Sequence, residues 1–254
     1  MTIFLIWEPV RLNAICLQIL PMHLPPLIEG RLIRRYKRFL AEIALQDGRV
    51  IAAHTPNTGR MEGLTRPGSR VWLRDSHNPK RKYRYSWVMV EAKPGVLVGI
   101  DTALSNKLVR EGIENGVINA LQGYETIREE VAYGAERSRI DLLLEQGPGN
   151  RCYVEVKNVT LVENHVAFFP DAVTDRGRKH LRELAKRVAA GERGVIFYCV
   201  QRQDAHSVRP ADHIDPRYGD TLREVISKGV EAIAYRADVS VGEIRLVSEL
   251  QVLV

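Results

Sequence analysis

Residues 138–157 constrain this chain more than any other stretch, because they contain two apolar segments separated by a turn rich in glycine and proline. This pattern predicts two strands that pair as a hairpin. Asp141 lies on the first strand, and Glu155 and Lys157 lie on the second. Successive side chains of a strand point to opposite faces, so Glu155 and Lys157 share a face and the intervening valines share the other. With the turn centred near Pro148, Asp141 lies opposite Glu155 or one residue away.

Two carboxylates at such a cross-strand distance can share a hard cation such as Mg²⁺, which takes oxygen ligands and keeps several waters. The ammonium of Lys157 can orient or deprotonate an attacking water, or stabilise charge on a phosphate. The sequence therefore predicts a metal-dependent nuclease centre at Asp141, Glu155 and Lys157, with Asp141 and Glu155 as metal ligands. The alternative is a plain hairpin in which Lys157 forms a salt bridge with one of the two carboxylates.

The net charge of +6 is unevenly distributed along the 254 residues. Residues 22–100 contain 15 lysines and arginines but only 6 acids, whereas residues 101–254 contain 21 and 24. This asymmetry favours a basic N-terminal module that meets a polyanion, followed by a module that supplies carboxylates. Nucleic acid is the partner that fits both.

The three cysteines are far apart and form no C-x-x-C pair, so neither a zinc ribbon nor a disulfide framework is expected. This usage indicates a cytoplasmic protein. Residues 1–21 are apolar but interrupted by Glu8, Pro9 and Arg11, which excludes a membrane span, and they lack the marks of a signal peptide. Our hypothesis is that Met22 is the functional start and that residues 1–21 are an extension outside the domains.

About five short strands, split by turns, are expected between residues 27 and 100. The first is predicted from Arg38 to Leu45, and the turn at Asp47-Gly48 leads into the second. Short strands at this spacing suit a small barrel of the OB type, in which a basic face with interleaved aromatic residues binds nucleic acid.

Two basic clusters dominate the charge of this expected barrel. Cations and aromatic rings that alternate can neutralise phosphates and stack on bases from one surface. The alternative is an ordinary solvated face. The first cluster, which surrounds Tyr36, contains Arg31, Arg34, Arg35, Lys37 and Arg38, and the second contains Lys80, Arg81, Lys82 and Arg84, with Tyr83 and Tyr85.

The pattern changes to alternating helices and strands after residue 100. Helices are expected from Asp101 to Asn115, from near Thr174 to Arg187, and from Pro216 to Gly229, with strands between them. This order predicts an α/β sandwich with a mixed sheet, in which the carboxylates face a helix-lined groove. On the second helix, Arg176 shares a face with Lys179 and His180 and can bind phosphate beside the metal, unless this face is simply solvated.

Several segments together resemble the sugar fermentation stimulation protein family (SfsA), from about Met22 to the C-terminus. The resemblance implies an OB-like domain over residues 22–100, a PD-(D/E)XK nuclease-like domain over residues 101–254, DNA binding, and a regulatory role in sugar, notably maltose, utilisation. The segments are Gly30 to Ala41, His54-Thr-Pro-Asn-Thr-Gly-Arg-Met61, Asn78 to Lys82, Ser138-Arg-Ile-Asp141, Val154 to Leu161, Phe169 to Leu181 and Pro210 to Pro216.

The resemblance also implies roles for single residues. Asp141 matches the metal-binding aspartate, although Ile140 stands before it where the nuclease pattern has proline. Glu155 matches the second carboxylate and Lys157 the lysine. Related nucleases often add a helix-borne glutamate, for which Glu111 is the preferred match and Glu130 the alternative.

The function expected from the sequence is Mg²⁺- or Mn²⁺-dependent hydrolysis of DNA phosphodiesters. The rival hypothesis is a non-catalytic DNA-binding regulator built on the same fold. In the OB-like part, His54, Asn57 and Arg60 can either contact the nucleic-acid backbone or only build their loop.

Overall fold

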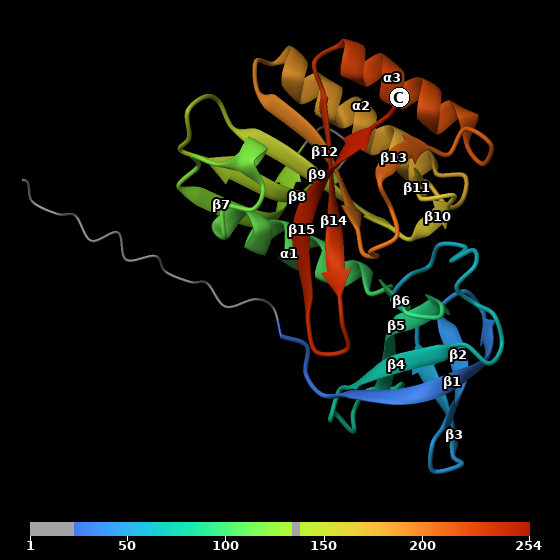
Figure 1. Cartoon of the computed structure of the whole chain (residues 1–254). Coiled ribbons are helices and arrows are strands. Elements are labelled where there is room, and N and C mark those ends of the chain that lie inside the picture. The colour runs from blue at the N-terminus through green and yellow to red at the C-terminus, as the bar shows by residue number, and fades with distance from the viewer. Residues whose placement is uncertain (1–22, 134–137) are drawn as a thin grey trace, which may run out of the picture.

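The structure is a computed structural model that describes residues 23–133 and 138–254. It contains a six-stranded sheet in the N-terminal part and a nine-stranded sheet with three α-helices in the C-terminal part. Figure 1 shows the two parts one above the other, with the barrel below. The hypothesis about residues 1–21 and Met22 concerns a segment that lies outside the described residues.

The six N-terminal strands close into the expected OB-type barrel. Their order is β3-β2-β1-β4-β5-β6, and a parallel pairing of β3 with β5 closes the sheet on itself. Their inward side chains, among them Leu32, Ile43 and Trp87, form one buried cluster. The strands are β1 (Leu27–Tyr36), β2 (Leu40–Leu45), β3 (Val50–His54), β4 (Arg70–Asp75), β5 (Tyr85–Lys93) and β6 (Val96–Gly99).

The expectation of five strands missed β1, which carries most of the first basic cluster. Its alternation of buried and exposed residues is broken by a register shift between Leu32 and Arg34, so the period of two is hard to recognise. The strand predicted from Arg38 begins at Leu40 instead. Lys37 and Arg38 have positive φ angles of 51° and 63° and form the turn between β1 and β2.

The C-terminal part is the expected α/β sandwich with a mixed sheet. The strand order is β10-β11-β13-β15-β14-β12-β9-β8-β7, and β9, β12 and β14 are parallel neighbours, whereas β7, β8 and β9 are antiparallel. The elements are α1 (Thr102–Glu114), the short 3₁₀ helix η1 (Asn119–Leu121), β7 (Thr126–Tyr133), β8 (Ser138–Glu145), β9 (Cys152–Val159), β10 (Leu161–Glu163), β11 (Val166–Phe169), α2 (Asp175–Ala189), β12 (Arg193–Val200), β13 (Ser207–Pro210), α3 (Pro216–Ser227), β14 (Glu231–Val239) and β15 (Ile244–Val252).

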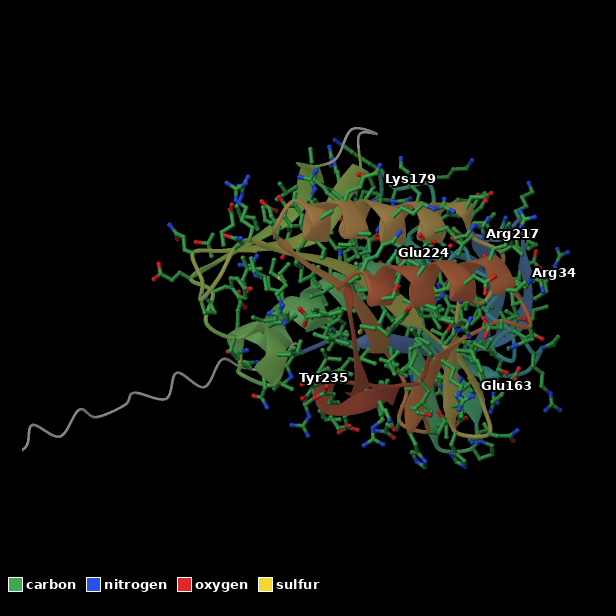
Figure 2. The ribbon with its side chains drawn as sticks, turned by 90° about the horizontal axis from the view of Figure 1, so that it is seen from above. Arg34, Glu163, Lys179, Arg217, Glu224 and Tyr235 are labelled. Carbon is green, nitrogen blue, oxygen red and sulfur yellow. The ribbon has the colours of Figure 1, made fainter. Side chains whose placement is uncertain are left out.

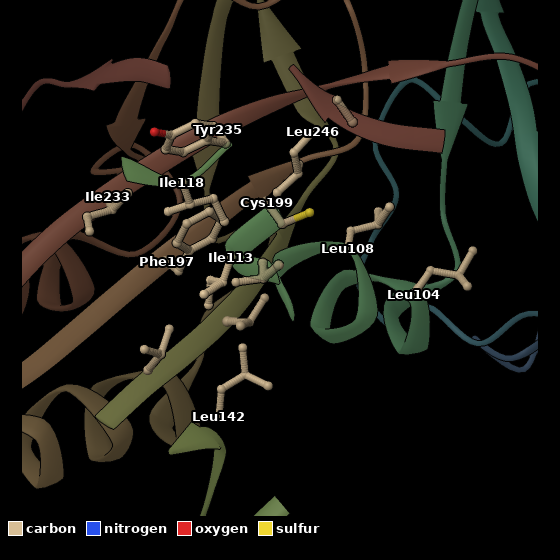
Figure 3. Close-up of a cluster of buried hydrophobic side chains, with 14 of the residues drawn as sticks. Leu104, Leu108, Ile113, Ile118, Leu142, Phe197, Cys199, Ile233, Tyr235 and Leu246 are labelled. Carbon is tan, nitrogen blue, oxygen red and sulfur yellow. The ribbon is translucent and has the colours of Figure 1, made fainter. Parts of the chain in front are cut away.

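The two faces of the large sheet are covered by different helices. Leu104, Leu108 and Ile113 of α1 pack on one face, against side chains of the central strands (Figure 3). Side chains of α2 and α3, such as Leu184 and Leu222, pack on the other face. None of the helices in the described part of the chain combines the length and the apolar composition that crossing a bilayer requires.

The barrel and the sandwich share part of one hydrophobic core. Trp72 of β4 and Met89 of β5 belong to the same buried cluster as the side chains of α1. The backbone nitrogen of Gly99, at the end of β6, donates to the carbonyl of Gln201 at 2.9 Å. The long β14–β15 hairpin extends toward the barrel in Figure 1. The two parts are therefore packed as one body at this junction.

A buried ion pair joins the starts of α2 and α3. Thr174 caps α2 by accepting from the Gly177 nitrogen, and Asp215 caps α3 by accepting from the Tyr218 nitrogen. The Arg178 guanidinium donates to both Asp215 oxygens, at 2.9 and 2.7 Å. Asp215 also accepts from the Thr174 nitrogen at 2.9 Å. Four hydrogen bonds to one carboxylate thus fix the end of α2 that carries Arg176 and Lys179.

Candidate metal centre

The two predicted metal-binding carboxylates lie where the β8–β9 ladder ends. The last paired residues are Leu142 and Val154. Asp141 directly precedes Leu142 on β8, so it lies just beyond the end of the ladder. There the Asp141 carboxylate accepts from the Val156 backbone nitrogen at 2.7 Å, through Oδ2. A side-chain oxygen thus takes the place of a backbone acceptor, which holds Asp141 beside the strand that carries Glu155.

Glu155 is 2% exposed, and its two oxygens have very different surroundings. Oε1 accepts from Lys157 Nζ at 2.6 Å and contacts His180 Nδ1 of α2. Oε2 is buried and has no hydrogen-bond partner. A carboxylate oxygen left bare in a protein interior is costly. The Oε2 atom is therefore the position at which a cation or an ordered water would satisfy the site.

The pKa values of Asp141 and Glu155 agree with a cation at this position. Burial and the neighbouring Glu155 carboxylate raise the pKa of Asp141 to about 6. Burial also acts to raise the pKa of Glu155, but Lys157 and His180 outweigh it and lower that pKa below its usual value. Two carboxylates that compete for ionisation are relieved by a cation placed between them. The residues present therefore fit a divalent metal ion.

Asp141 and Glu155 would supply only part of the shell of such an ion. Within residues 23–133 and 138–254, no three His, Cys, Asp or Glu side chains are arranged to hold a metal ion by themselves. Mg²⁺ commonly binds one or two carboxylates and completes its shell with waters and substrate phosphate. The centre matches that mode rather than a closed protein cage.

A pocket of about 790 Å³ opens beside Asp141, between the β7–β8 edge of the sheet and α2. Its lining includes Asp141, together with the predicted phosphate-binding residues Arg176, Lys179 and His180. Arg176 Nε lies 3.3 Å from His180 Nε2, as expected for residues one turn apart on a helix. Figure 2 shows Lys179 on α2. The structure thus gathers the predicted metal ligand and the predicted helix residues at one place.

The pocket contains further residues that the sequence analysis did not single out. Glu183 of α2 is 1% exposed, and its Oε2 atom is buried without a partner. Its position three residues after His180 is the signal that places it on the same face of α2. Three more cations line the pocket, namely Arg139, Arg182 and Lys186.

The helix-borne glutamate assigned to Glu111 is not brought to the pocket. Glu130, the alternative on β7, lines it. On α1 the residue that reaches the centre is Asn106, and a helix turns by about 140° over the five residues from there to Glu111. Glu111 therefore faces a different direction from the side chain that contacts Asp141.

The first basic cluster of the barrel is largely engaged in internal hydrogen bonds. Arg34 forms two hydrogen bonds with Glu42, at 2.7 and 2.8 Å, and its guanidinium lies 5.2 Å from the centre of the Tyr36 ring. Arg35 donates to the carbonyls of Asn57 and Arg60. Lys37 and Arg38 are exposed at the turn. This cluster therefore offers fewer charges to a polyanion than its sequence indicates.

The second basic cluster lies in the segment before β5 and is more open. Lys80, Arg81 and Lys82 are exposed, whereas Arg84 forms an ion pair with Asp75 at 2.5 Å. In the loop after β3, the Asn57 side chain accepts from the Gly59 nitrogen at 2.8 Å and builds the loop. Arg60 of that loop is exposed, and His54 at the end of β3 is partly buried.

Comparison with known proteins identifies both parts of the chain. The family model described as the SfsA N-terminal OB domain matches residues 33–100, and the model described as the sugar fermentation stimulation protein RE domain matches residues 103–243. Sugar fermentation stimulation protein homologs from Geobacter metallireducens and Pelobacter propionicus are 60% and 61% identical. Each alignment covers 91% of this chain and 100% of the relative.

A solved structure is similar over nearly the whole chain. It is that of Pyrococcus furiosus SfsA in complex with Ca²⁺, with 30% sequence identity and a TM-score of 0.84. The similarity covers 92% of this chain and 98% of the Pyrococcus chain. The arrangement of an OB barrel followed by a mixed α/β sandwich is therefore shared with an experimentally determined structure.

Proposed function

The chain belongs to the sugar fermentation stimulation protein family, and we propose that it binds DNA and hydrolyses phosphodiester bonds with a divalent metal ion held by Asp141 and Glu155. The observation that carries this proposal is the buried, unpartnered Oε2 atom of Glu155, a carboxylate whose other oxygen accepts from the Lys157 ammonium and whose charge acts on Asp141. A protein that only docks DNA gains nothing from carboxylates directed at phosphates, because like charges repel. The intact constellation therefore favours an enzyme.

The metal ion expected at this centre is Mg²⁺ or Mn²⁺. When bound, such an ion supplies Lewis-acid polarisation of a phosphate and a more acidic bound water. The Pyrococcus furiosus relative was solved in complex with Ca²⁺, which is also a hard cation that takes oxygen ligands. This finding supports a divalent cation for the family fold.

The protein's own side chains have separable roles in the proposed reaction. Lys157 Nζ, 2.6 Å from Glu155 Oε1, can orient the attacking water or stabilise negative charge on the phosphate. His180 contacts the same Glu155 oxygen and fixes the orientation of that carboxylate. Arg176 and Lys179, which line the pocket, are placed to hold the phosphate that reacts.

DNA binding is supported by the cations of both parts. On α2, Arg176, Lys179, Arg182 and Lys186 recur every three or four residues, so they form one stripe along the pocket. In the barrel, the exposed residues from Lys80 to Lys82 add a second basic surface. Backbone phosphates are the ligands that such surfaces bind without reading sequence.

The proposed setting of this activity is the cytoplasm. Both cysteines in the described residues, Cys152 and Cys199, are buried free thiols, which suits a reducing compartment. The family name supports a role in sugar utilisation, which we propose to be exerted through DNA. The competing proposal for the same fold is a regulator that binds DNA without cleaving it.

The experiment that separates these proposals is incubation of the purified protein with single-stranded, duplex and branched DNA. Each DNA is tested with Mn²⁺, with Mg²⁺ and with EDTA. Cleavage of at least one DNA with metal and none with EDTA is the expected result. Binding to DNA without cleavage under any metal would favour the regulator.

A further inference from the structure

One side chain of α1 reaches the candidate metal centre. Asn106 Nδ2 donates to Asp141 Oδ1 at 3.0 Å. The other Asp141 oxygen accepts from the Val156 nitrogen, so both oxygens of this carboxylate have a donor. Only the NH₂ group of an asparagine can face a carboxylate favourably, which fixes the orientation of the amide.

The position of Asn106 is fixed by contacts with the barrel. Asp101, which caps α1, is 1% exposed and accepts from Arg74 of β4 at 2.9 Å. Thr102 Oγ1 donates to the Pro56 carbonyl at 3.3 Å. Because Asn106 lies about one helical turn after Thr102, its side chain starts from a backbone that the barrel holds in place.

A second contact of α1 holds the strand that carries Lys157. Ser105, the neighbour of Asn106, accepts from Gln201 Nε2 at 3.0 Å. The same Gln201 amide donates to Asn158 Oδ1 at 2.8 Å, and Asn158 directly follows Lys157 on β9. Two adjacent residues of α1 thus connect to both strands of the centre.

Helix stability does not explain an asparagine at this position. Asparagine is a weak helix former, and it lies inside α1 rather than at its cap, where asparagine is favoured. Alanine would form the helix better. The gain from Asn106 therefore comes from the contact with Asp141.

We propose that Asn106 is a positioning residue that aims the Asp141 carboxylate for metal binding, from a helix anchored on the barrel. This inference rests on the proposed function, because it assigns Asp141 to the metal. Hydrogen-bond partners of metal ligands orient them, and their loss typically lowers metal affinity by about 10–100-fold. Asn106 thereby takes the place of the helix-borne carboxylate that the family resemblance implied on α1.

The test compares Asn106→Ala and Asn106→Leu with wild type and with Lys107→Ala. Lys107 is the exposed neighbour on α1, so its replacement controls for changes to the helix itself. Two quantities are measured on the full chain, namely the Kd for Mn²⁺ by calorimetry and the hydrogen exchange rate of the Val156 amide without metal. The Val156 amide reports directly on Asp141, to which it donates.

We expect both Asn106 variants to bind Mn²⁺ about 10–100-fold more weakly and to exchange the Val156 amide severalfold faster. Lys107→Ala is expected to match wild type in both measurements. Unchanged exchange of Val156 in both Asn106 variants would overturn the inference, whatever happens to metal affinity. If wild type binds no Mn²⁺, the proposed function fails, while the exchange rate still decides whether Asn106 positions Asp141.

Discussion

The Asp141 carboxylate accepts a hydrogen bond from the backbone nitrogen of Val156 at 2.7 Å, where the ladder between β8 and β9 has ended. This contact places an acidic side chain just beyond the last paired residues of the two strands, beside the strand that carries Glu155. Glu155 is buried and Asp141 is partly buried, yet one Glu155 oxygen has no partner. The local fold therefore creates a need for positive charge at one point, and that need underlies the predictions below.

Metal binding should weaken in mild acid. Because the pKa of Asp141 is raised to about 6 by burial and by Glu155, this carboxyl takes up a proton as the pH falls through that value. A metal ligand must be ionised, so we expect Mn²⁺ affinity to fall by about tenfold per pH unit below about 6. Calorimetric titrations at a series of pH values measure this slope. Affinity that stays constant across that range would contradict the assignment of Asp141.

The same pKa shift makes folding more favourable as the pH falls, whereas it makes metal binding less favourable. The folded state holds the Asp141 proton more tightly than the unfolded chain, whose reference value is 3.8. The contribution of this group to stability is therefore fully present below 3.8 and is lost as the pH rises through about 6. Added Mn²⁺ should restore stability above that pH, because it binds the ionised, folded form.

The exposed cations of the barrel should control the salt dependence of DNA binding. Replacing Lys80, Arg81 and Lys82 together by alanine removes up to three phosphate contacts. The slope of log affinity against log salt should then fall by about 2–3, since each contact contributes roughly 0.9. Fluorescence anisotropy with duplex DNA at several salt concentrations measures the slope.

A matched triple variant controls for the loss of net charge. Arg223, Lys228 and Arg245 each form ion pairs with acids of the sandwich, and their replacement should leave the slope nearly unchanged. If the barrel variant keeps the wild-type slope, DNA lies along Arg176 and Lys179 instead of on the barrel.

Tyr36 should matter for single strands through its ring. The Arg34 guanidinium lies 5.2 Å from the centre of this ring but is paired with Glu42, so the ring rather than the charge is what this end of the barrel offers to a base. Tyr36→Ala should lower affinity for single-stranded DNA by about 1–3 kcal/mol if the ring stacks on a base. Tyr36→Phe keeps the ring and should bind like wild type. Equal affinity of Tyr36→Ala and wild type would remove Tyr36 from the binding surface.

The ion pair between Arg178 and Asp215 should be important for stability. Both side chains are buried, with 8% and 2% exposed, so Arg178→Ala leaves the Asp215 charge in the interior without its cationic partner. The expected loss is about 3–5 kcal/mol of unfolding free energy. Lys228→Ala breaks a pair with Glu224 that is more than half exposed and screened by water, so its replacement should cost much less. Urea unfolding of the two variants compares these costs, and equal losses would show that the buried pair has no special role.

The sequence predicted the strand faces and helix starts near the centre well, because these features depend on patterns that repeat over a few residues. The alternation along β9 predicted that Glu155 and Lys157 share one face of the strand. In the structure they do, and Val154 and Val156 pack with α1 on the opposite face. The start of α2 near Thr174 was also predicted, and in the structure the Thr174 side chain caps that helix. Such signals involve only a few neighbouring residues.

The parts that were not predicted depend on contacts between distant segments. Asn106 and Asp141 are separated by 35 residues, and no periodicity of α1 indicates that they meet. Glu183 belongs to the pocket because α2 packs over β9. The charge that Arg34 and Arg35 offer to DNA was overestimated, because in the fold Arg34 pairs with Glu42 and Arg35 donates to the loop after β3. Tertiary packing, rather than composition, decides which of these groups remain available.

The most direct test of a metal-dependent nuclease centre is the rate of DNA cleavage by single variants that leave the fold intact. Asp141→Asn, Glu155→Gln and Lys157→Met are each compared with wild type in Mn²⁺, while DNA affinity is measured in EDTA. We predict that all three variants lose cleavage and retain DNA binding close to that of wild type. Cleavage that persists in Asp141→Asn and Glu155→Gln, or that is absent from wild type with every divalent metal, would contradict the account.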